Sequence, residues 1–281
     1  MEFILEEGKH LHEECSTLIL PALSIGNVGQ LAIDLLVSSM GADRVGYLDD
    51  PFVLPCVGND AYGSASRGDL ALPLEAYDSP SNALSLIQQR SPLVKGKMVE
   101  FAKSLADFAI SSRKNHVVVL SSLDAGRRKR IDMSSEMQIF YLSSTHKDGT
   151  DDHCEKMGWK RLQEYNPTER KWEFLNDLAE GKFIDEGNWP SEDELIDEDY
   201  YPSLPFAALF SCFKAKGLKV TCILCYCSEG DNVPDSFQLA EATCKLLGLS
   251  ISNFHGKQGG GWLIPFSWTS LYGPPPDNSL F

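Results

Sequence analysis

The sequence has 281 residues, a formal net charge of −15 and 43% hydrophobic residues. This length and apolar content allow a sizeable core, whereas the negative charge argues against a nucleic-acid binder, which needs a basic face to neutralise phosphates. No stretch reaches the roughly 18 apolar residues of a membrane span. The cysteines are scattered through core-like segments, as in a reduced cytosolic protein. We therefore expect no nucleic-acid or membrane partner and a cytoplasmic location, with the nucleus as the alternative.

The first predicted elements are a buried strand, a glycine turn and a helix. Residues 18–20 form a short apolar run typical of a strand covered on both faces. From Val28 onward, apolar residues recur at the spacing of one helix face. The helix also carries a second apolar stripe: Ile33, Val37 and Met40. Two explanations remain open, because such a helix is either sunk in its own domain or shared with a partner subunit in a heterodimer.

The turn at Ser24–Gly29 is similar to a dinucleotide-binding G-x-G-x-x-G loop, with Ser in place of the first Gly. Asp49 and Asp50 follow the next predicted strand, at 45–48, in the position of a ribose-binding acid. These residues indicate a nucleotide- or nucleoside-binding enzyme as one hypothesis.

Other features of the turn favour a structural role. Ser24 reaches the backbone angles of a tight turn only with strain, and Pro21 interrupts the strand that should lead into the loop. The glycines of the turn also allow the helix and the strand to approach closely. We therefore interpret three residues as a structural turn: Gly26, Asn27 and Gly29.

The rest of the chain alternates between runs of strand length and amphipathic runs of helix length, which indicates an α/β fold. Strands at 70–77 and 83–89 predict an antiparallel pair, and the β-branched run at 116–120 predicts a central parallel strand. Residues 51–58 contain Pro55 and predict a bent or edge strand. The other predicted elements are strands at 139–142 and 220–227, helices at 97–111 and 205–215, and a helix ending at Leu247.

Three groups of residues are of types used in catalysis or metal binding, but each lacks the motif, spacing or orientation that this chemistry requires. Residues 121–124 contain Ser and Asp at the carboxyl end of the 116–120 strand, but no G-x-S-x-G motif accompanies them. Metal-ligand types at 146–154 lack a second ligand pair at zinc spacing. Cys222 and Cys225 point to opposite faces of a strand and cannot chelate one ion. We expect no catalytic residue, cofactor or metal.

Two segments differ from the rest of the chain. Residues 185–199 hold eight carboxylates and no Lys or Arg, which predicts a solvated, flexible insertion. Residues 269–281 form a tail in which three consecutive prolines predict a stiff polyproline stem. The tail ends in Leu280 and Phe281, an apolar pair that is unfavourable in water unless it docks. We expect one domain over residues 1–281 that contains this insertion and this tail.

Seven motifs occur in the order typical of one family. They are P-A-L-S-I-G-N-V-G-Q-L-A at 21–32, V-G-Y at 45–47, L-P-C-V-G-N at 54–59, Q-Q-R-S-P at 88–92, V-V-V-L-S-S at 117–122, S-E-G-D-N-V-P-D at 228–235 and I-P-F-S-W at 264–268. From about residue 16 onward, the chain resembles the proteasome assembly chaperone 2 family. The long acidic insertion is the chief departure.

This resemblance implies a three-layer α/β/α sandwich with a mixed, largely parallel sheet, similar to nucleoside phosphorylases but without a working active site. It implies a non-enzymatic chaperone that forms a heterodimer with proteasome assembly chaperone 1. The pair would promote assembly of the α-subunit ring of the 20S proteasome, with proteasome α-type subunits as further partners.

The resemblance also implies a role for the end of the tail. Family members tend to end in a hydrophobic-Tyr-any triplet that docks between neighbouring α subunits, its carboxylate facing a lysine. The corresponding residues here are Ser279, Leu280 and Phe281. They lack the hydrophobic first residue and the Tyr, so we expect weaker docking and a stronger tail on the partner chaperone.

Overall fold

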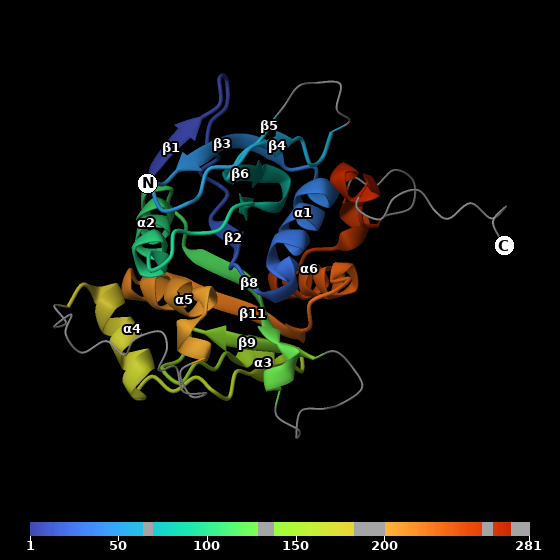
Figure 1. The fold of residues 1–281 in the computed structure, drawn as a ribbon. Helices are drawn as coiled ribbons and strands as arrows, with labels where there is room; N and C mark the ends of the chain where they lie inside the picture. The colour runs from blue at the N-terminus through green and yellow to red at the C-terminus, as the bar shows by residue number, and fades with distance from the viewer. Residues whose placement is uncertain (64–69, 129–137, 183–199, 255–260, 271–281) are drawn as a thin grey trace.

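The computed structural model describes residues 1–63, 70–128, 138–182, 200–254 and 261–270. The predicted acidic insertion at 185–199 and the tail from residue 271 lie outside the described residues. Strands run through the middle of the molecule and helices lie on both sides of them (Figure 1).

The described strands form one nine-stranded sheet and one short separate pair. The order in the large sheet is β1-β3-β6-β7-β2-β8-β11-β9-β10. Its strands are Glu2–Leu5 (β1), Thr17–Pro21 (β2), Asp43–Asp49 (β3), Leu74–Ser79 (β6), Leu84–Gln89 (β7), His116–Asp124 (β8), Ile139–Ser143 (β9), Lys160–Arg161 (β10) and Lys219–Cys227 (β11). The separate pair is Gly58–Asn59 (β4) and Leu70–Ala71 (β5).

The centre of the large sheet is parallel. β2 pairs in parallel with β7 and with β8, and β8 pairs in parallel with β11 along its whole length. Antiparallel pairs flank this centre: β7 with β6, β6 with β3, β3 with β1, and β11 with β9. The predictions of a central parallel strand at 116–120 and of an antiparallel pair before the 97–111 helix are confirmed.

Helices cover both faces of this sheet (Figure 1). One face carries α1 (Val28–Met40) and α6 (Val233–Leu247), and the other carries α2 (Met98–Ser111), α4 (Arg170–Glu180) and α5 (Pro205–Ala215). A short helix, α3 (Asp152–Lys156), precedes β10. Among the helices of the described residues, none combines the length and apolar character needed to cross a bilayer.

Side chains of the central strands point alternately into two apolar cores. On β8, Val117 and Val119 belong to the core with α2, α4 and α5, whereas Val118 and Leu120 belong to the core with α1 and α6. Since both faces are covered, the strand is a continuous apolar run rather than an alternating one. The predicted α/β/α layering and mixed, largely parallel sheet are confirmed.

The strand predicted at 51–58 is wrong. Residues 51–57 form a turn and irregular chain, which pairs through an isolated bridge between Val53 and Leu93. Pro51 and Pro55 have no N–H group to donate, so this segment cannot form a continuous ladder.

Candidate functional site

The glycine turn between β2 and α1 is shaped by backbone constraints. Gly26 and Asn27 have positive φ angles of 64° and 51°, a conformation that favours glycine and asparagine. Gly29 lies against the backbone of β8, because a Cβ added to it would overlap the carbonyl oxygen of Leu120 and would lie 3.3 Å from the Cβ of Pro21. The turn thus brings the helix and the strand into close approach.

The loop after β2 hydrogen-bonds to the end of β8 and lies against the loop after β11. Ser24 Oγ accepts a hydrogen bond from the Ser122 backbone N–H at 3.1 Å, and Ser122 Oγ donates to the carbonyl of Ile25 at 2.5 Å. The buried side chain of Asn232 lies so close to Gly26 that a Cβ there would overlap it. The hydroxyl groups of Ser24 and Ser122 are thus bonded within the fold.

The candidate ribose-binding acids are not beside the glycine turn. β7 and β6 lie between β2, which leads into the turn, and β3, which ends at Asp49. The carboxylate of Asp50 is buried and accepts a hydrogen bond from the Phe52 backbone N–H at 2.9 Å. In a dinucleotide fold the acid ends the strand next to the loop, so this topology does not support the nucleotide hypothesis.

The second apolar stripe of α1 is buried inside the chain itself. Ile33 is fully buried, and Val37 and Met40 are each 2% exposed. All three belong to the core that α1 shares with β8 and α6. Within this chain the three side chains are therefore covered by its own core.

The C-terminal segment 261–268 packs over α1 and α6. The backbone N–H of Leu263 donates to Ser39 Oγ at 2.9 Å near the end of α1. Trp268 is 5% exposed, and its ring centroid lies 6.4 Å from that of Phe237 on α6. The I-P-F-S-W motif that contributes to the family resemblance is therefore part of this covering layer.

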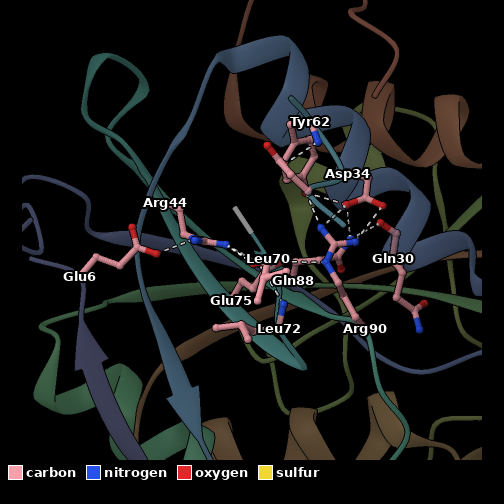
Figure 2. Close-up of polar contacts among 11 residues, drawn as sticks. Glu6, Gln30, Asp34, Arg44, Tyr62, Leu70, Leu72, Glu75, Gln88 and Arg90 are labelled. Carbon is pink, nitrogen blue, oxygen red and sulfur yellow. Dashed lines mark hydrogen bonds and ion pairs between the residues drawn. The ribbon is translucent and has the colours of Figure 1, made fainter. Parts of the chain in front are cut away.

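A partly buried arginine joins α1 to β6 and β7 (Figure 2). Arg90 directly follows β7; its Nη2 donates to Asp34 Oδ1 at 3.1 Å and its Nε donates to Glu75 Oε2 at 2.7 Å. Asp34 Oδ1 also accepts from the Tyr62 hydroxyl at 2.6 Å and from Gln88 Nε2 at 2.7 Å. The side chain of Glu75 is 1% exposed and that of Arg90 is 18% exposed, so these charges are largely withdrawn from water.

A second arginine extends this network toward the edge of the sheet (Figure 2). Arg44 Nη1 donates to Glu75 Oε1 at 3.1 Å and to the carbonyl of Leu70 at 2.7 Å, and its Nε donates to Glu6 Oε1 at 2.5 Å. The network thus links Glu6, just after β1, and the separate β5 strand to β3 and β6.

Arg90 and Tyr62 each have a raised pKa in this network. Burial acts to lower the pKa of Arg90, but the carboxylates of Asp34 and Glu75 outweigh it and the pKa is raised. Burial, assisted by Asp34, raises the pKa of Tyr62. Arg90 therefore stays charged and the Tyr62 hydroxyl stays a donor at neutral pH. The sequence analysis does not predict this cluster. The Q-Q-R-S-P motif contains Gln88 and Arg90, but the sequence alone indicates only a family resemblance there.

The metal-ligand types at 146–154 serve local structure. Asp151 caps α3, with Oδ1 accepting from the His153 backbone N–H at 2.9 Å and Oδ2 accepting from Thr145 Oγ1 at 2.7 Å. Burial alone would raise the pKa of Asp151, but these hydrogen bonds lower it. Burial raises the pKa of Cys154 to about 12. Within the described ranges, no three His, Cys, Asp or Glu side chains are grouped to hold a metal ion.

The cysteines of β11 lie on opposite faces, as predicted. Cys222 belongs to the core with α5, and Cys225 belongs to the core with α1. Burial raises the pKa of both thiols, so both are neutral packing groups at neutral pH.

A model of the PAC2 family matches residues 18–254. The chain belongs to the PAC2 family. The match includes the glycine turn, the Arg90 network and the central strands of the sheet. It ends before the C-terminal segment 261–268.

Named relatives of this PAC2-family chain span nearly all of it. It is 30% identical over 269 residues to proteasome assembly chaperone 2 of Xenopus tropicalis, with 94% of each chain covered. It is 28% identical over 272 residues to proteasome assembly chaperone 2 of Homo sapiens, again with 94% of each chain covered. These relatives are named as chaperones, in agreement with the expectation that the chain is not an enzyme.

A solved structure shares the fold of this PAC2-family chain. Pyrococcus furiosus PbaA, described as an archaeal homologue of proteasome-assembly chaperone, aligns with a TM-score of 0.59 at 17% identity. The alignment covers 89% of this chain and 87% of PbaA. At this identity the likeness shows the fold alone.

Proposed function

We propose that this chain is a proteasome assembly chaperone that pairs with proteasome assembly chaperone 1 and promotes formation of the α-subunit ring of the 20S proteasome. The observation that carries this proposal is the likeness to proteasome assembly chaperone 2 over 94% of both chains. The hydroxyl groups of Ser24 and Ser122 bond within the fold, which favours a binding protein over a nucleotide enzyme.

The proposal includes the domain organisation and the location. Residues 1–281 act as one chaperone domain, with an acidic insertion at 185–199 and a tail at 269–281. The partners are proteasome assembly chaperone 1 and proteasome α-type subunits, in the cytoplasm, with the nucleus as the alternative. No nucleic-acid or membrane partner is proposed.

The tail supplies the contact with the α ring. Ser279, Leu280 and Phe281 dock between neighbouring α subunits, less tightly than a tail that ends in the usual hydrophobic-Tyr-any triplet. Exposing an apolar pair beyond three prolines is unfavourable in water. Covering the pair in a pocket lowers the free energy of the complex.

Reconstitution tests the proposal. The chain is co-expressed with proteasome assembly chaperone 1 and separately mixed with purified α-subunit intermediates. A 1:1 heterodimer and a stable complex with the intermediates are expected. Deleting Ser279–Phe281, or appending residues after Phe281, should weaken only the second complex; a wild-type chain that forms neither complex would refute the proposed function.

A further inference from the structure

The segment 261–268 divides its side chains between two sides. Trp262, Pro265 and Trp268 lie toward the body of the protein: Pro265 and Trp268 are buried, and Trp262 packs 6.0 Å from the ring of Phe237. Three large apolar residues between them are exposed instead: Leu263 at 46%, Ile264 at 53% and Phe266 at 46%. We name Leu263, Ile264 and Phe266 the outer triplet.

The backbone that carries the outer triplet is fixed at both ends. Near its start, Leu263 N–H donates to Ser39 Oγ at 2.9 Å. Near its end, Ser267 N–H donates to the carbonyl of Ala61 at 3.0 Å, and Trp268 N–H donates to the carbonyl of Pro265 at 3.0 Å. An apolar surface held in place in this way loses little conformational entropy when a partner covers it.

The length of chain beyond this segment limits how far it can lie from the partner that receives the tail. Ser270 closes the described segment, and Ser279, the first residue of the docking triplet, lies nine residues further on. Nine residues span at most about 30 Å. If Ser279–Phe281 are seated between α subunits, Ser270 is held within that distance of the α ring, and the outer triplet lies four to seven residues before Ser270.

We propose that the outer triplet contacts an apolar surface of a proteasome α subunit beside the pocket that receives the tail. This inference rests on the proposed function and deepens it by adding a second contact. Two linked contacts bind more tightly than either alone, because the first raises the effective concentration of the second. The outer triplet therefore compensates for a tail that lacks the usual triplet.

Serine variants of exposed aliphatic residues test the contact. The variants are Leu263→Ser with Ile264→Ser, deletion of Ser279–Phe281, and the combination of both. The matched control is Ile110→Ser, because Ile110 is 47% exposed and lies on α2, on the opposite face of the sheet. Each heterodimer is assayed for melting temperature, for pairing with proteasome assembly chaperone 1, and for binding to purified α-subunit intermediates.

The double serine variant should keep its melting temperature and its pairing but bind the intermediates about tenfold or more weakly. Its combination with the tail deletion should abolish this binding, while Ile110→Ser should change it less than twofold. Two results would contradict the proposed contact. One is that the double variant binds the α-subunit intermediates as the wild type does; the other is that it loses pairing with proteasome assembly chaperone 1 but still binds the intermediates. The second result would assign the outer triplet to the partner chaperone. If the wild type binds no intermediate, the proposed function itself fails.

Discussion

Gly29 on α1 and Leu120 on β8 lie so close together that a single methyl group on Gly29 would overlap the carbonyl oxygen of Leu120. The helix is thereby seated directly on the central parallel strand. This contact explains why glycine occupies the position without any reference to a bound phosphate.

The replacement Gly29→Ala should destabilise the chain by at least about 2 kcal/mol, because backbone on both sides must shift to relieve the overlap. Urea unfolding followed by circular dichroism measures this loss. The matched control is Gly58→Ala, where the nearest atom to an added Cβ is the Cβ of Ala71 at 3.9 Å; its effect should stay within about 0.5 kcal/mol. Equal stability of the two variants would contradict the close approach.

Elements with strong local signals could be predicted from the sequence. The period of α1 and the β-branched run of β8 reflect burial against immediate neighbours, and both elements form where expected. The strand predicted at 51–58 failed because Pro51 and Pro55 outweigh the apolar character of that segment. Local patterns thus locate most elements of the layers but not their irregular connections.

The arrangement of the candidate site could not be predicted in this way. Arg90 meets a carboxylate 56 residues earlier in the chain, at Asp34. The segment that packs near the end of α1 comes from further still, since Leu263 and Ser39 are 224 residues apart. Nothing in the neighbourhood of either residue encodes such a pairing. The apolar pattern of Ile33, Val37 and Met40 is therefore compatible, by itself, with both a buried helix and a subunit contact.

The arginine network predicts a large effect of removing one charge. Arg90→Met removes the arginine from the largely buried carboxylates of Asp34 and Glu75 and leaves Glu75 with the Arg44 ion pair, so we expect a loss of about 3 kcal/mol of stability. Arg90→Lys should lose less, because it keeps the charge but not the forked geometry. Lys97→Met breaks an exposed pair with Glu100 and should cost at most about 0.5 kcal/mol. Denaturant titration of the three variants gives the comparison, and a similar cost for Arg90→Met and Lys97→Met would show that the network is not buried.

His116 predicts a pH dependence of stability. Its Nε2 lies 3.1 Å from Thr221 Oγ1. Burial, assisted by Lys219 and opposed by Asp151, lowers its pKa from 6.5 to about 4. Below pH 6.5 the unfolded chain binds a proton that the folded chain does not, so stability is lost as the pH falls toward 4 and is unaffected by this group above 6.5.

The expected loss from His116 between pH 7.5 and pH 5 is about 2 kcal/mol. His116→Gln removes the titrating group, so its free energy of unfolding should fall by that much less over the same interval. Urea titrations of both proteins at the two pH values isolate the difference. Identical pH dependence of variant and wild type would show that His116 has the same pKa in the folded and unfolded chains, which would contradict the prediction.

The structural interpretation of the glycine turn predicts that nucleotides do not change the melting temperature. A ligand that binds only the folded chain stabilises it by about 2.7 kcal/mol at a hundredfold excess over Kd and raises its melting temperature. Differential scanning fluorimetry with NAD, NADP, ATP and nucleosides should show no shift. A saturable shift that Gly26→Ala abolishes would restore the nucleotide-binding hypothesis.

The central claim, that this PAC2-family chain assembles proteasomes, is tested most directly by purifying the tagged chain from its native source and identifying its companions by mass spectrometry. We predict proteasome assembly chaperone 1 in a 1:1 ratio together with proteasome α-type subunits, and depletion of the α subunits when Ser279–Phe281 are deleted. Recovery of the chain with neither the second chaperone nor any α subunit would contradict the account.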